Sequence, residues 1–326
     1  MLSLVRSIPA QLEQSWEQAG TVISRVPESP PAKLAICGMG GSGISGDLIR
    51  GLLLHTSPVP IEVVKAYTLP GWIAGDDFAV VISYSGNTEE TLSLWKALRE
   101  REVPRIAVSS GGSLTELARK EALPVIEVPA GLPPRASVGH LFSACLRLVY
   151  HWDLYPDAET ELAATTALIS SRIDDWEKEA RTIASSLKGK FPVIHALDSR
   201  FTPLAYRMVC EINENSKMLA HSHTYSEMNH NELNGFEGGV DENVVLVMLD
   251  PGKDYTHHRN RKRAEIIEGV LSSVPRSRIE AEGSTLLERF FSLLIRGDLV
   301  SVYLAELKGI DPVPVNLIES LKKELG

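Results

Sequence analysis

The chain has 326 residues, of which 44% are hydrophobic and 23% are charged, with 33 basic side chains against 42 acidic ones. This composition is typical of a globular protein and excludes a disordered or collagen-like chain, and the length favours about two domains. The net charge of −9 argues against non-specific binding to nucleic acid or to an anionic membrane, because both require a basic field.

The cysteines and the longest apolar segment narrow the class further. Cys37, Cys145 and Cys210 lie far apart without a CxxC spacing, so neither a disulfide framework nor a structural zinc site is expected, and a cytoplasmic protein is favoured. Residues 1–18 are interrupted by glutamates, which predicts a helix and not a signal peptide. Charged side chains also interrupt residues 286–307, which predicts a buried helix or helix pair and not a membrane span.

From residue 33 onward, β-rich runs alternate with helical patterns. Strands are expected at residues 34–39, 61–67, 78–85, 105–110 and 123–129, and helices at residues 43–54, 89–102 and 113–121. Nearly continuous apolar runs at 34–37, 78–82 and 106–108 are typical of strands that are covered on both faces in a parallel sheet. The alternation predicts an α/β fold, a doubly wound αβα sandwich with right-handed crossovers.

A second αβ series follows a turn-rich junction. A helix is expected at 136–150, and the junction at 151–157 predicts a domain boundary, which gives an N-terminal domain of residues 1–153 and a C-terminal domain of residues 154–326. The second series comprises helices at 159–187, 203–213 and 259–274 and strands at 192–197, 216–223, 244–250 and 276–283. The C-terminal domain therefore resembles a degenerate copy of the first, although no residue-level repeat is legible.

The first chemical motif is the glycine loop, residues 37–43, which places four glycines between an apolar strand and a helix. Glycines let backbone N–H groups approach a ligand that side chains would obstruct. The spacing of Gly38, Gly40 and Gly43 matches the dinucleotide fingerprint G-x-G-x-x-G. The acidic residue expected about 20 residues later is missing, however, because the next strand ends near Lys65. A tight structural turn is the alternative.

The second motif is the serine loop, residues 83–88, with the sequence Ser-Tyr-Ser-Gly-Asn-Thr at the exit of another apolar strand. Its two serines and its threonine precede a helix, whose N-terminus presents free N–H groups and the positive end of the dipole to a phosphate. Asn87, with Glu90 three residues later, predicts an N-cap and a capping box; an ordinary capped turn is the alternative. Both loops should meet at the carboxyl edge of one sheet, where doubly wound folds bind ligands.

The third segment, residues 211–217, is followed by a group of imidazole and carboxylate side chains: His221, His223, Glu227, His230 and Glu232. Such a group is compatible with a metal site, although no HExxH or comparable helical pair is present. Glu214 and His230, 16 residues apart on separate elements, can instead act on one substrate as base and acid. The spacing alone leaves both interpretations open.

Six ordered motifs resemble those of the bifunctional phosphoglucose/phosphomannose isomerases, a branch of the sugar-isomerase (SIS) domain superfamily. They are GMGGSGISGDLI, SYSGNTEETL, SSGGSL, PPRASVGHLF, EINENSK and MNHNELNGFE, and the resemblance extends from about residue 33 to the C-terminal LKKEL. It implies two SIS domains per chain, a homodimer, hexose 6-phosphate substrates, and neither a metal nor an organic cofactor.

The resemblance also implies roles for individual residues. The sugar pocket and the phosphate site would be formed by Gly40, Gly41, Ser42, Ser83, Ser85 and Thr88. Arg135 would stabilise the anionic intermediate, Glu214 would be the general base, His230 would open the sugar ring, and Lys322 would assist it from the C-terminus. The second half lacks both loops, so one active site per chain is expected, at the domain and dimer interface.

One position departs from the family pattern. Val315 stands where a threonine is expected, which keeps the size of the side chain but removes the hydroxyl. The resemblance therefore predicts activity on glucose 6-phosphate more firmly than acceptance of mannose 6-phosphate.

Two other functions are compatible with SIS domains. A non-catalytic sugar-phosphate-binding regulator would normally add a helix-turn-helix domain, for which the roughly 30 residues before the first strand are too few. An amidotransferase that makes glucosamine 6-phosphate would need a terminal cysteine nucleophile, and no cysteine precedes Cys37.

Overall fold

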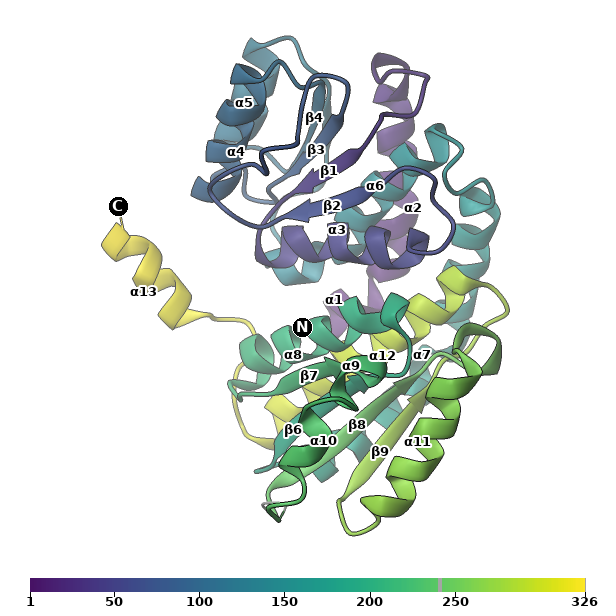
Figure 1. Ribbon diagram of the computed structural model, residues 1–326. Coiled ribbons are helices and arrows are strands. Elements are labelled where there is room, and N and C mark those ends of the chain that lie inside the picture. Colours follow the sequence, from purple (N-terminus) through teal and green to yellow (C-terminus); the bar gives the residue numbers. More distant parts are fainter. Residues whose placement is uncertain (240–241, 326) are drawn as a thin grey trace. The chain divides into compact units, whose positions relative to one another are not determined.

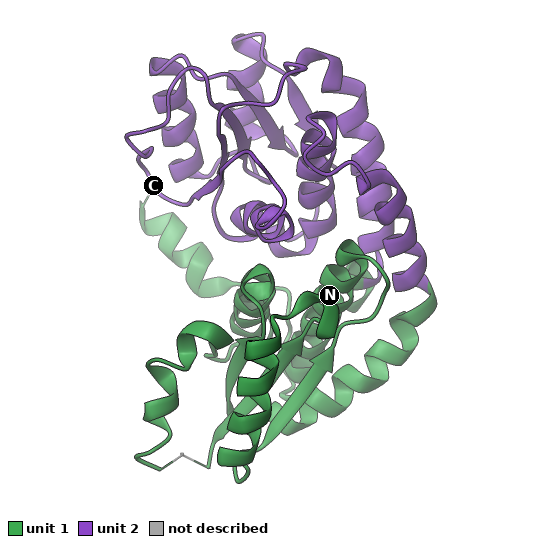
Figure 2. Cartoon of the chain, turned by 45° about the vertical axis from the view of Figure 1, so that its right-hand side comes forward, with its two compact units in different colours: residues 1–5, 171–326 green, residues 6–170 purple. Residues whose placement is uncertain are grey.

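The computed structural model describes residues 1–239 and 242–325, which form two compact units (Figures 1 and 2). Unit 1 comprises Met1–Val5 and Ser171–Gly326, and unit 2 comprises Arg6–Ser170. The chain passes from unit 2 to unit 1 within helix α7 (Ala158–Leu187). The turn-rich junction at 151–157 connects helix α6 (Val138–His151) to α7.

Unit 2 is built on a parallel sheet of five strands in the order β2-β1-β3-β4-β5. The strands are β1 (Leu34–Cys37), β2 (Ile61–Val64), β3 (Phe78–Ile82), β4 (Arg105–Ser109) and β5 (Val125–Glu127). Strands β1, β3 and β4 are buried along their whole length, as the continuous apolar runs predicted. The parallel pairing places the carboxyl ends of these three strands side by side at one edge of the sheet.

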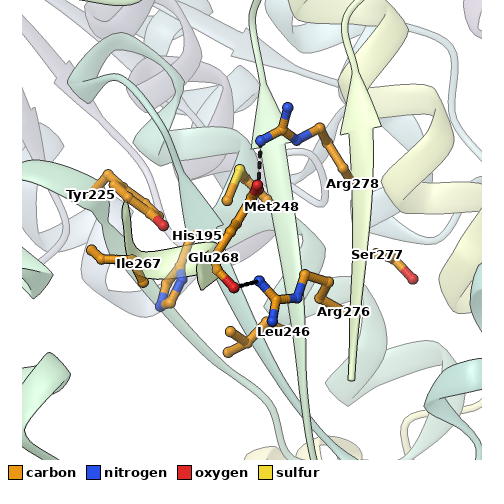
Figure 3. A pocket seen from close by; sticks show the side chains of 9 residues that line it. All are labelled: His195, Tyr225, Leu246, Met248, Ile267, Glu268, Arg276, Ser277 and Arg278. Atoms are coloured by element: carbon orange, nitrogen blue, oxygen red, sulfur yellow. Dashed lines mark hydrogen bonds and ion pairs between the residues drawn. The ribbon is translucent and has the colours of Figure 1, made fainter. Parts of the chain in front are cut away.

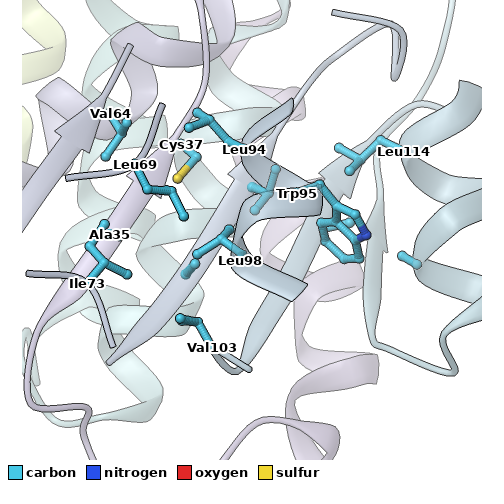
Figure 4. Packing of buried hydrophobic residues seen from close by; sticks show 14 residues of the cluster. Ala35, Cys37, Val64, Leu69, Ile73, Leu94, Trp95, Leu98, Val103 and Leu114 are labelled. Atoms are coloured by element: carbon cyan, nitrogen blue, oxygen red, sulfur yellow. The ribbon is translucent and has the colours of Figure 1, made fainter. Parts of the chain in front are cut away.

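Helices cover both faces of this sheet (Figure 1). One face carries α2 (Ile8–Val22), α3 (Gly40–Leu53) and α6, and the other carries α4 (Glu89–Glu100) and α5 (Gly112–Lys120). In α4 the apolar residues Leu94, Trp95 and Leu98 recur at helical spacing and are completely buried. Figure 4 shows them packed against side chains of the central strands, including Ala35 and Cys37.

Unit 1 repeats this topology with four parallel strands in the order β7-β6-β8-β9. The strands are β6 (Phe191–Ala196), β7 (His221–Thr224), β8 (Val244–Asp250) and β9 (Arg276–Glu280). The first four strands of unit 2 have the same relative order, so the predicted degenerate copy exists at the level of topology. The expected α/β fold with two parallel sheets is confirmed.

The helices of unit 1 also form two layers. One face of the sheet is covered by α8 (Thr202–Ser216) and α12 (Leu286–Leu307), and the other by α9 (Tyr225–Met228), α10 (Glu232–Gly235) and α11 (His258–Val270). The remaining helices of unit 1 are the second half of α7, which is bonded to α12, the short α1 (Leu2–Arg6) and the C-terminal α13 (Asn316–Leu325). Residues 286–307 form one buried helix, and no described helix is long and apolar enough to span a membrane.

Several predicted element boundaries were wrong, for identifiable reasons. Helix α3 begins at Gly40 and not at residue 43, because tertiary packing overrides the poor helix propensity of glycine. Helix α8 continues to Ser216 and ends where Lys217 adopts a left-handed conformation with φ of 51°, a role usually taken by glycine. Helices α9 and α10 have four residues each, too few to give a periodic pattern.

Candidate functional site

The glycine loop brings two backbone segments into direct contact at the carboxyl edge of the unit 2 sheet. A Cβ atom on Gly41 would lie 2.7 Å from the carbonyl group of Pro134, a distance that no side chain tolerates. Pro134 opens the 3₁₀ turn η2 (Pro134–Ser137), which carries the buried Arg135. The absence of a side chain at Gly41 therefore lets the Arg135 segment approach the start of α3.

Ser42 joins the glycine loop to the serine loop. Its Oγ accepts a hydrogen bond of 3.0 Å from the backbone N–H of Tyr84, and its side chain is buried. The Ser42 hydroxyl thus fixes the spacing of the two loops, in addition to any contact with a ligand.

The serine and threonine hydroxyl groups of the serine loop differ in exposure and in partners. Ser83 is completely buried, and its Oγ donates to Oγ1 of Thr88 at 3.0 Å and accepts from the Thr88 N–H at 3.4 Å. Because Ser83 donates to it, the Thr88 hydroxyl retains its own proton for donation to a ligand. Ser85 is exposed, and its Oγ accepts from the backbone N–H of Asn87 at 3.3 Å. Ser83 is therefore a support for the loop, whereas Ser85 and Thr88 are accessible donors.

The predicted capping box at Asn87 and Glu90 is wrong. Helix α4 begins at Glu89 with Thr88 as its N-cap residue, and no side chain caps its N-terminus. The Asn87 Oδ1 instead accepts from the backbone N–H of Ser113 at 3.0 Å, which ties the serine loop to the start of α5. Because the Asn87 side chain bonds to the start of α5, it does not cap α4. The first N–H groups of α4 therefore remain suited to bind an anion.

Tyr84 supports the serine loop in a way that its sequence did not predict. Its buried hydroxyl donates to the carbonyl oxygen of Pro129 at 2.8 Å and accepts from the N–H of Leu132 at 2.9 Å. Burial raises the pKa of this phenol, so it stays protonated and keeps both bonds. Tyr84 thereby connects the serine loop to the segment that leads to Arg135. In the sequence, its position inside the serine-loop motif is the only indication of this role.

These contacts bring together one group of the predicted site residues. Within unit 2 the group comprises Gly40, Gly41, Ser42, Ser83, Ser85, Thr88 and Arg135. Neutral hydroxyl donors, an uncapped helix N-terminus and one guanidinium group suit a small anionic ligand.

The predicted base, Glu214, lies in the last turn of α8, and buried charged residues earlier in this helix hold it in place. Arg207 donates from Nε to Asp298 Oδ1 at 2.9 Å and from Nη2 to Asp298 Oδ2 at 2.6 Å, and its Nη2 lies 3.1 Å from Glu211 Oε1. Each of these three residues is only 3% exposed. Burial raises the pKa of the Asp298 carboxyl, and the Arg207 guanidinium opposes that rise. Asp298 belongs to α12, so the pair locks α8 onto α12.

A chain of hydrogen bonds extends this network to the last turn of α8. The Asn215 amide donates to Glu211 Oε2 and to Ser301 Oγ, both at 2.9 Å. The Ser216 hydroxyl donates to the carbonyl oxygen of Ser301 at 2.7 Å. Glu214 therefore lies on a helical turn in which Glu211, Asn215 and Ser216 are held by buried hydrogen bonds. In the motif EINENSK, Glu211, Asn215 and Ser216 therefore have a structural role, beside the predicted base Glu214.

Glu214 faces an open groove of about 460 Å³ within unit 1. The groove is lined by the end of α8 and the start of α13, through Asn213, Glu214, Lys217, Met218, Leu219, Pro314, Val315, Asn316, Leu317 and Ile318. It brings Glu214 together with Val315, the position that departs from the family pattern. His230 lies in the turn between α9 and α10 and Lys322 on α13, and both side chains are exposed.

The corresponding edge of the unit 1 sheet carries paired carboxylates in place of hydroxyls. Asp198, after β6, accepts from the N–H and from Nε of Arg200 at 3.2 and 3.1 Å. Asp250, at the end of β8, lies 3.3 Å from Arg261 and 3.6 Å from Arg278. A phosphate would meet negative charge there, and Arg200, Arg261 and Arg278 are already paired with these carboxylates.

The described residues contain no cluster of side chains that could form the metal site left open by the sequence. Within residues 1–239 and 242–325, no group of three or more histidine, cysteine, aspartate or glutamate side chains is arranged to hold an ion. Glu232, one of the candidate ligands, accepts hydrogen bonds from two histidines.

Comparisons with known proteins identify relatives along the whole chain. A model of the bacterial phospho-glucose isomerase C-terminal SIS domain matches residues 176–325, and a model of the SIS domain matches residues 29–132. A bifunctional phosphoglucose/phosphomannose isomerase of Caldicellulosiruptor bescii is 34% identical over 100% of this chain and 99% of the relative. The protein of the same description from Aquifex aeolicus is 38% identical over 91% of both chains.

Solved structures show the same fold at lower identity. The C-terminal domain of glucosamine-fructose-6-phosphate aminotransferase from Francisella tularensis has a TM-score of 0.76 and 16% identity, with coverage of 96% of this chain and 98% of that one. This likeness shows a shared fold and nothing more.

The buried pair that holds α8 gives a test of stability. We expect Asp298→Asn to lower the free energy of unfolding by about 3–5 kcal/mol, because it removes one partner of a buried ion pair. The matched control is Asp175→Asn in an exposed ion pair with Arg172 and Lys178, where a loss of at most about 1 kcal/mol is expected. Urea unfolding followed by circular dichroism measures both, and equal losses would contradict the role given to Asp298.

Proposed function

Because the chain belongs to the family of bifunctional phosphoglucose/phosphomannose isomerases, we propose that it interconverts glucose 6-phosphate and mannose 6-phosphate with fructose 6-phosphate. The observation that carries the proposal to this chain is the anion-binding edge of unit 2, where accessible hydroxyls and an uncapped helix N-terminus adjoin the Arg135 segment. In this proposal the predicted N-terminal domain binds the phosphate, and the predicted C-terminal domain supplies the base.

The phosphate binds through groups that carry no formal charge. Ser85 and Thr88 donate their hydroxyl protons, the first N–H groups of α4 add the positive end of the helix dipole, and Ser83 supports Thr88 from below. Because the phosphate is remote from the reacting carbons, its binding energy serves to orient the sugar. Gly40, Gly41 and Ser42 form the neighbouring wall, on which backbone groups contact the sugar.

The isomerisation moves one proton between C2 and C1 of the open-chain sugar. Glu214 removes the proton from one carbon and returns it to the other, and the carboxylate of one side chain reaches both carbons on the same face. The intermediate enediolate is negative, and the Arg135 guanidinium stabilises it electrostatically. The anchored turn of α8 supports this role, because a base that shuttles a proton must keep its position.

The cyclic sugar must open before this step. Ring opening transfers a proton from the C1 hydroxyl to the ring oxygen, which suits an imidazole because it exchanges protons near neutral pH. We assign this role to His230, with Lys322 assisting it through its positive charge. All proposed proton transfers use protein side chains alone, and neither a metal nor an organic cofactor takes part.

The setting in the cell is part of the proposal. We propose a homodimer in the cytoplasm, supported by the family resemblance and by the state of the thiols. Cys37, Cys145 and Cys210 are free thiols, which fits a reducing compartment. Burial raises the pKa of Cys37 and of Cys145 to about 12, so these two thiols stay protonated and unreactive.

The dual substrate range is tested by assaying each hexose phosphate separately. Mannose 6-phosphate gives the same enediol with the opposite C2 configuration, so the groove must allow rotation about the C2–C3 bond. Val315 lines the groove beside Glu214 and keeps the volume of a threonine, so we expect fructose 6-phosphate from both sugars. Product from glucose 6-phosphate alone would restrict the range. Product from neither, with binding retained, would favour the non-catalytic sugar-phosphate-binding regulator.

The role of Glu214 gives a kinetic prediction. Glu214→Gln keeps the shape of the side chain but removes the base, so we expect kcat to fall by about 10²–10⁴-fold. The matched control is Glu265→Gln, an exposed carboxylate of α11 that lies 3.4 Å from Lys262, which should leave kcat unchanged. Near-normal turnover of Glu214→Gln would remove Glu214 from the mechanism, and competition by 5-phosphoarabinonate checks that its binding site is intact.

The phosphate site gives a binding prediction. Thr88→Val removes a hydroxyl donor at nearly constant volume, so the inhibition constant of 5-phosphoarabinonate should rise by about 10–100-fold, as expected for a lost hydrogen bond to a charged group. Ser85→Ala should act in the same direction. The control is Thr91→Val on the same helix, because the Thr91 hydroxyl is completely buried and has no hydrogen-bond partner in the described chain. Unchanged inhibition of Thr88→Val would exclude the proposed phosphate site.

A further inference from the structure

The turn that carries His230, residues 229–231, is held at its backbone by the preceding helix. The His230 N–H donates to the carbonyl oxygen of Glu227 at 3.0 Å, and the Asn231 N–H donates to that of Met228 at 3.3 Å. Met228 is completely buried among the core residues between the unit 1 sheet and α11. The imidazole of His230 is exposed, so its position depends on how firmly this turn is attached on both sides.

On the other side of the turn, Glu232 attaches it to the sheet. One carboxylate oxygen, Oε1, lies 2.6 Å from Nε2 of His195 on β6, and the other, Oε2, lies 3.0 Å from Nε2 of His221 on β7. The register pairs His195 with His223 and Val193 with His221, so both imidazoles leave the same face of two adjacent strands. One side chain thus connects the first residue of α10 to both strands.

The electrostatics keep this carboxylate ionised. Burial raises the pKa of Glu232, but the hydrogen bonds and charges of His195 and His221 lower it by more than burial raises it. The pKa of Glu232 therefore lies below its usual value. An ionised carboxylate only accepts hydrogen bonds, so both histidines present a proton on Nε2. The His195 side chain is 3% exposed and that of His221 is 48% exposed, so the first bond is the more protected of the two.

The other charged groups near His195 already have partners. Figure 3 shows the small cavity beside it, with Tyr225, Ile267 and three charged residues, Glu268, Arg276 and Arg278. Glu268 is paired with Arg278. Arg276 donates to the backbone carbonyl oxygen of Glu268 at 2.8 Å. Glu232 is therefore the carboxylate that engages His195.

Hydrogen bonds within residues 227–232 link the anchored Glu232 to the turn that carries His230. The Asn231 Oδ1 accepts from the Glu232 N–H at 2.6 Å, and its Nδ2 donates to Glu227 Oε1 at 3.1 Å. The amide of Asn229, by contrast, is buried and has no hydrogen-bond partner among the described residues. Side chains thus restrain the turn through Asn231 and Glu232, the two residues that directly follow His230.

We propose that Glu232 is the positioning residue of the ring-opening step: clamped between His195 and His221, its carboxylate holds the turn that presents His230 to the sugar. This inference rests on the proposed function, because it takes His230 as the ring-opening residue. The proposal gives Glu232 no contact with the substrate: each of its oxygens accepts from an imidazole, and its role is to hold the turn. A displacement of about 1 Å in a catalytic group can cost about 10²-fold in rate, so loosening the clamp should impair ring opening.

Anomerisation of glucose 6-phosphate isolates this step, because the α and β forms interconvert through ring opening without proton transfer at C2. Exchange NMR measures its enzyme-catalysed rate above the spontaneous rate. We expect Glu232→Gln, which cannot accept from both imidazoles, to lower this rate about tenfold or more while KM changes less than twofold. The control is Glu237→Gln, an exposed carboxylate of the same segment, which should anomerise at the wild-type rate.

The exposed half of the clamp provides a second pair of variants, which remains informative if Glu232→Gln folds poorly. His221→Leu removes one N–H donor and should slow anomerisation several-fold. His221→Gln restores a side-chain N–H and should recover most of the rate, which a purely structural role of the ring would not predict. Circular dichroism confirms that each variant is folded.

The outcomes separate this inference from the proposed function. His230→Asn sets the floor of the catalysed rate. If His230→Asn is inactive while Glu232→Gln and His221→Leu anomerise at the wild-type rate with unchanged kcat, the positioning role of Glu232 is wrong and the assignment of His230 stands. If His230→Asn itself anomerises normally, the ring-opening role of His230 is wrong and the inference falls with it.

Discussion

The backbone contact between the start of α3 and the turn η2 is the constraint on which the proposed phosphate-binding edge of unit 2 depends. At Gly41 the two backbones approach so closely that any side chain would collide with the carbonyl group of Pro134. This contact fixes the Arg135 segment, and Ser42 extends the same rigid surface to the serine loop through the N–H of Tyr84. A cationic side chain and a set of neutral donors are thereby held in a fixed arrangement before any ligand arrives.

The two units share a strand order but use opposite chemistry at the carboxyl edges of their sheets. Unit 2 leaves hydroxyl protons and helix N–H groups available there, whereas unit 1 fills the position with aspartates that are paired with arginines. In the proposed mechanism, unit 1 instead contributes Glu214 on α8 and His230 in the turn between α9 and α10. In both places a polar network, a buried one around Arg207 and a partly exposed one around Glu232, lies next to an accessible side chain.

Sequence patterns predicted the elements better than the contacts between them. The continuous apolar runs of β1, β3 and β4 identified strands covered on both faces, because burial on both sides leaves no position for a polar residue. The capping box at Asn87 and Glu90 was wrong because a local motif cannot register competition from another loop, here the N–H of Ser113. Tyr84 and Asp298 were missed for the same reason, since their partners are distant in the chain.

The sequence by itself determined the class of fold, the two-domain organisation and the family, because hydrophobic periodicity and ordered motifs are properties of the chain alone. Only the tertiary structure decided which hydroxyls are accessible, that Glu214 rests on an anchored turn, and that Glu232 lies between His195 and His221. Hydrogen bonds and exposure depend on residues that folding brings together from distant parts of the chain, and neither spacing nor composition records those encounters.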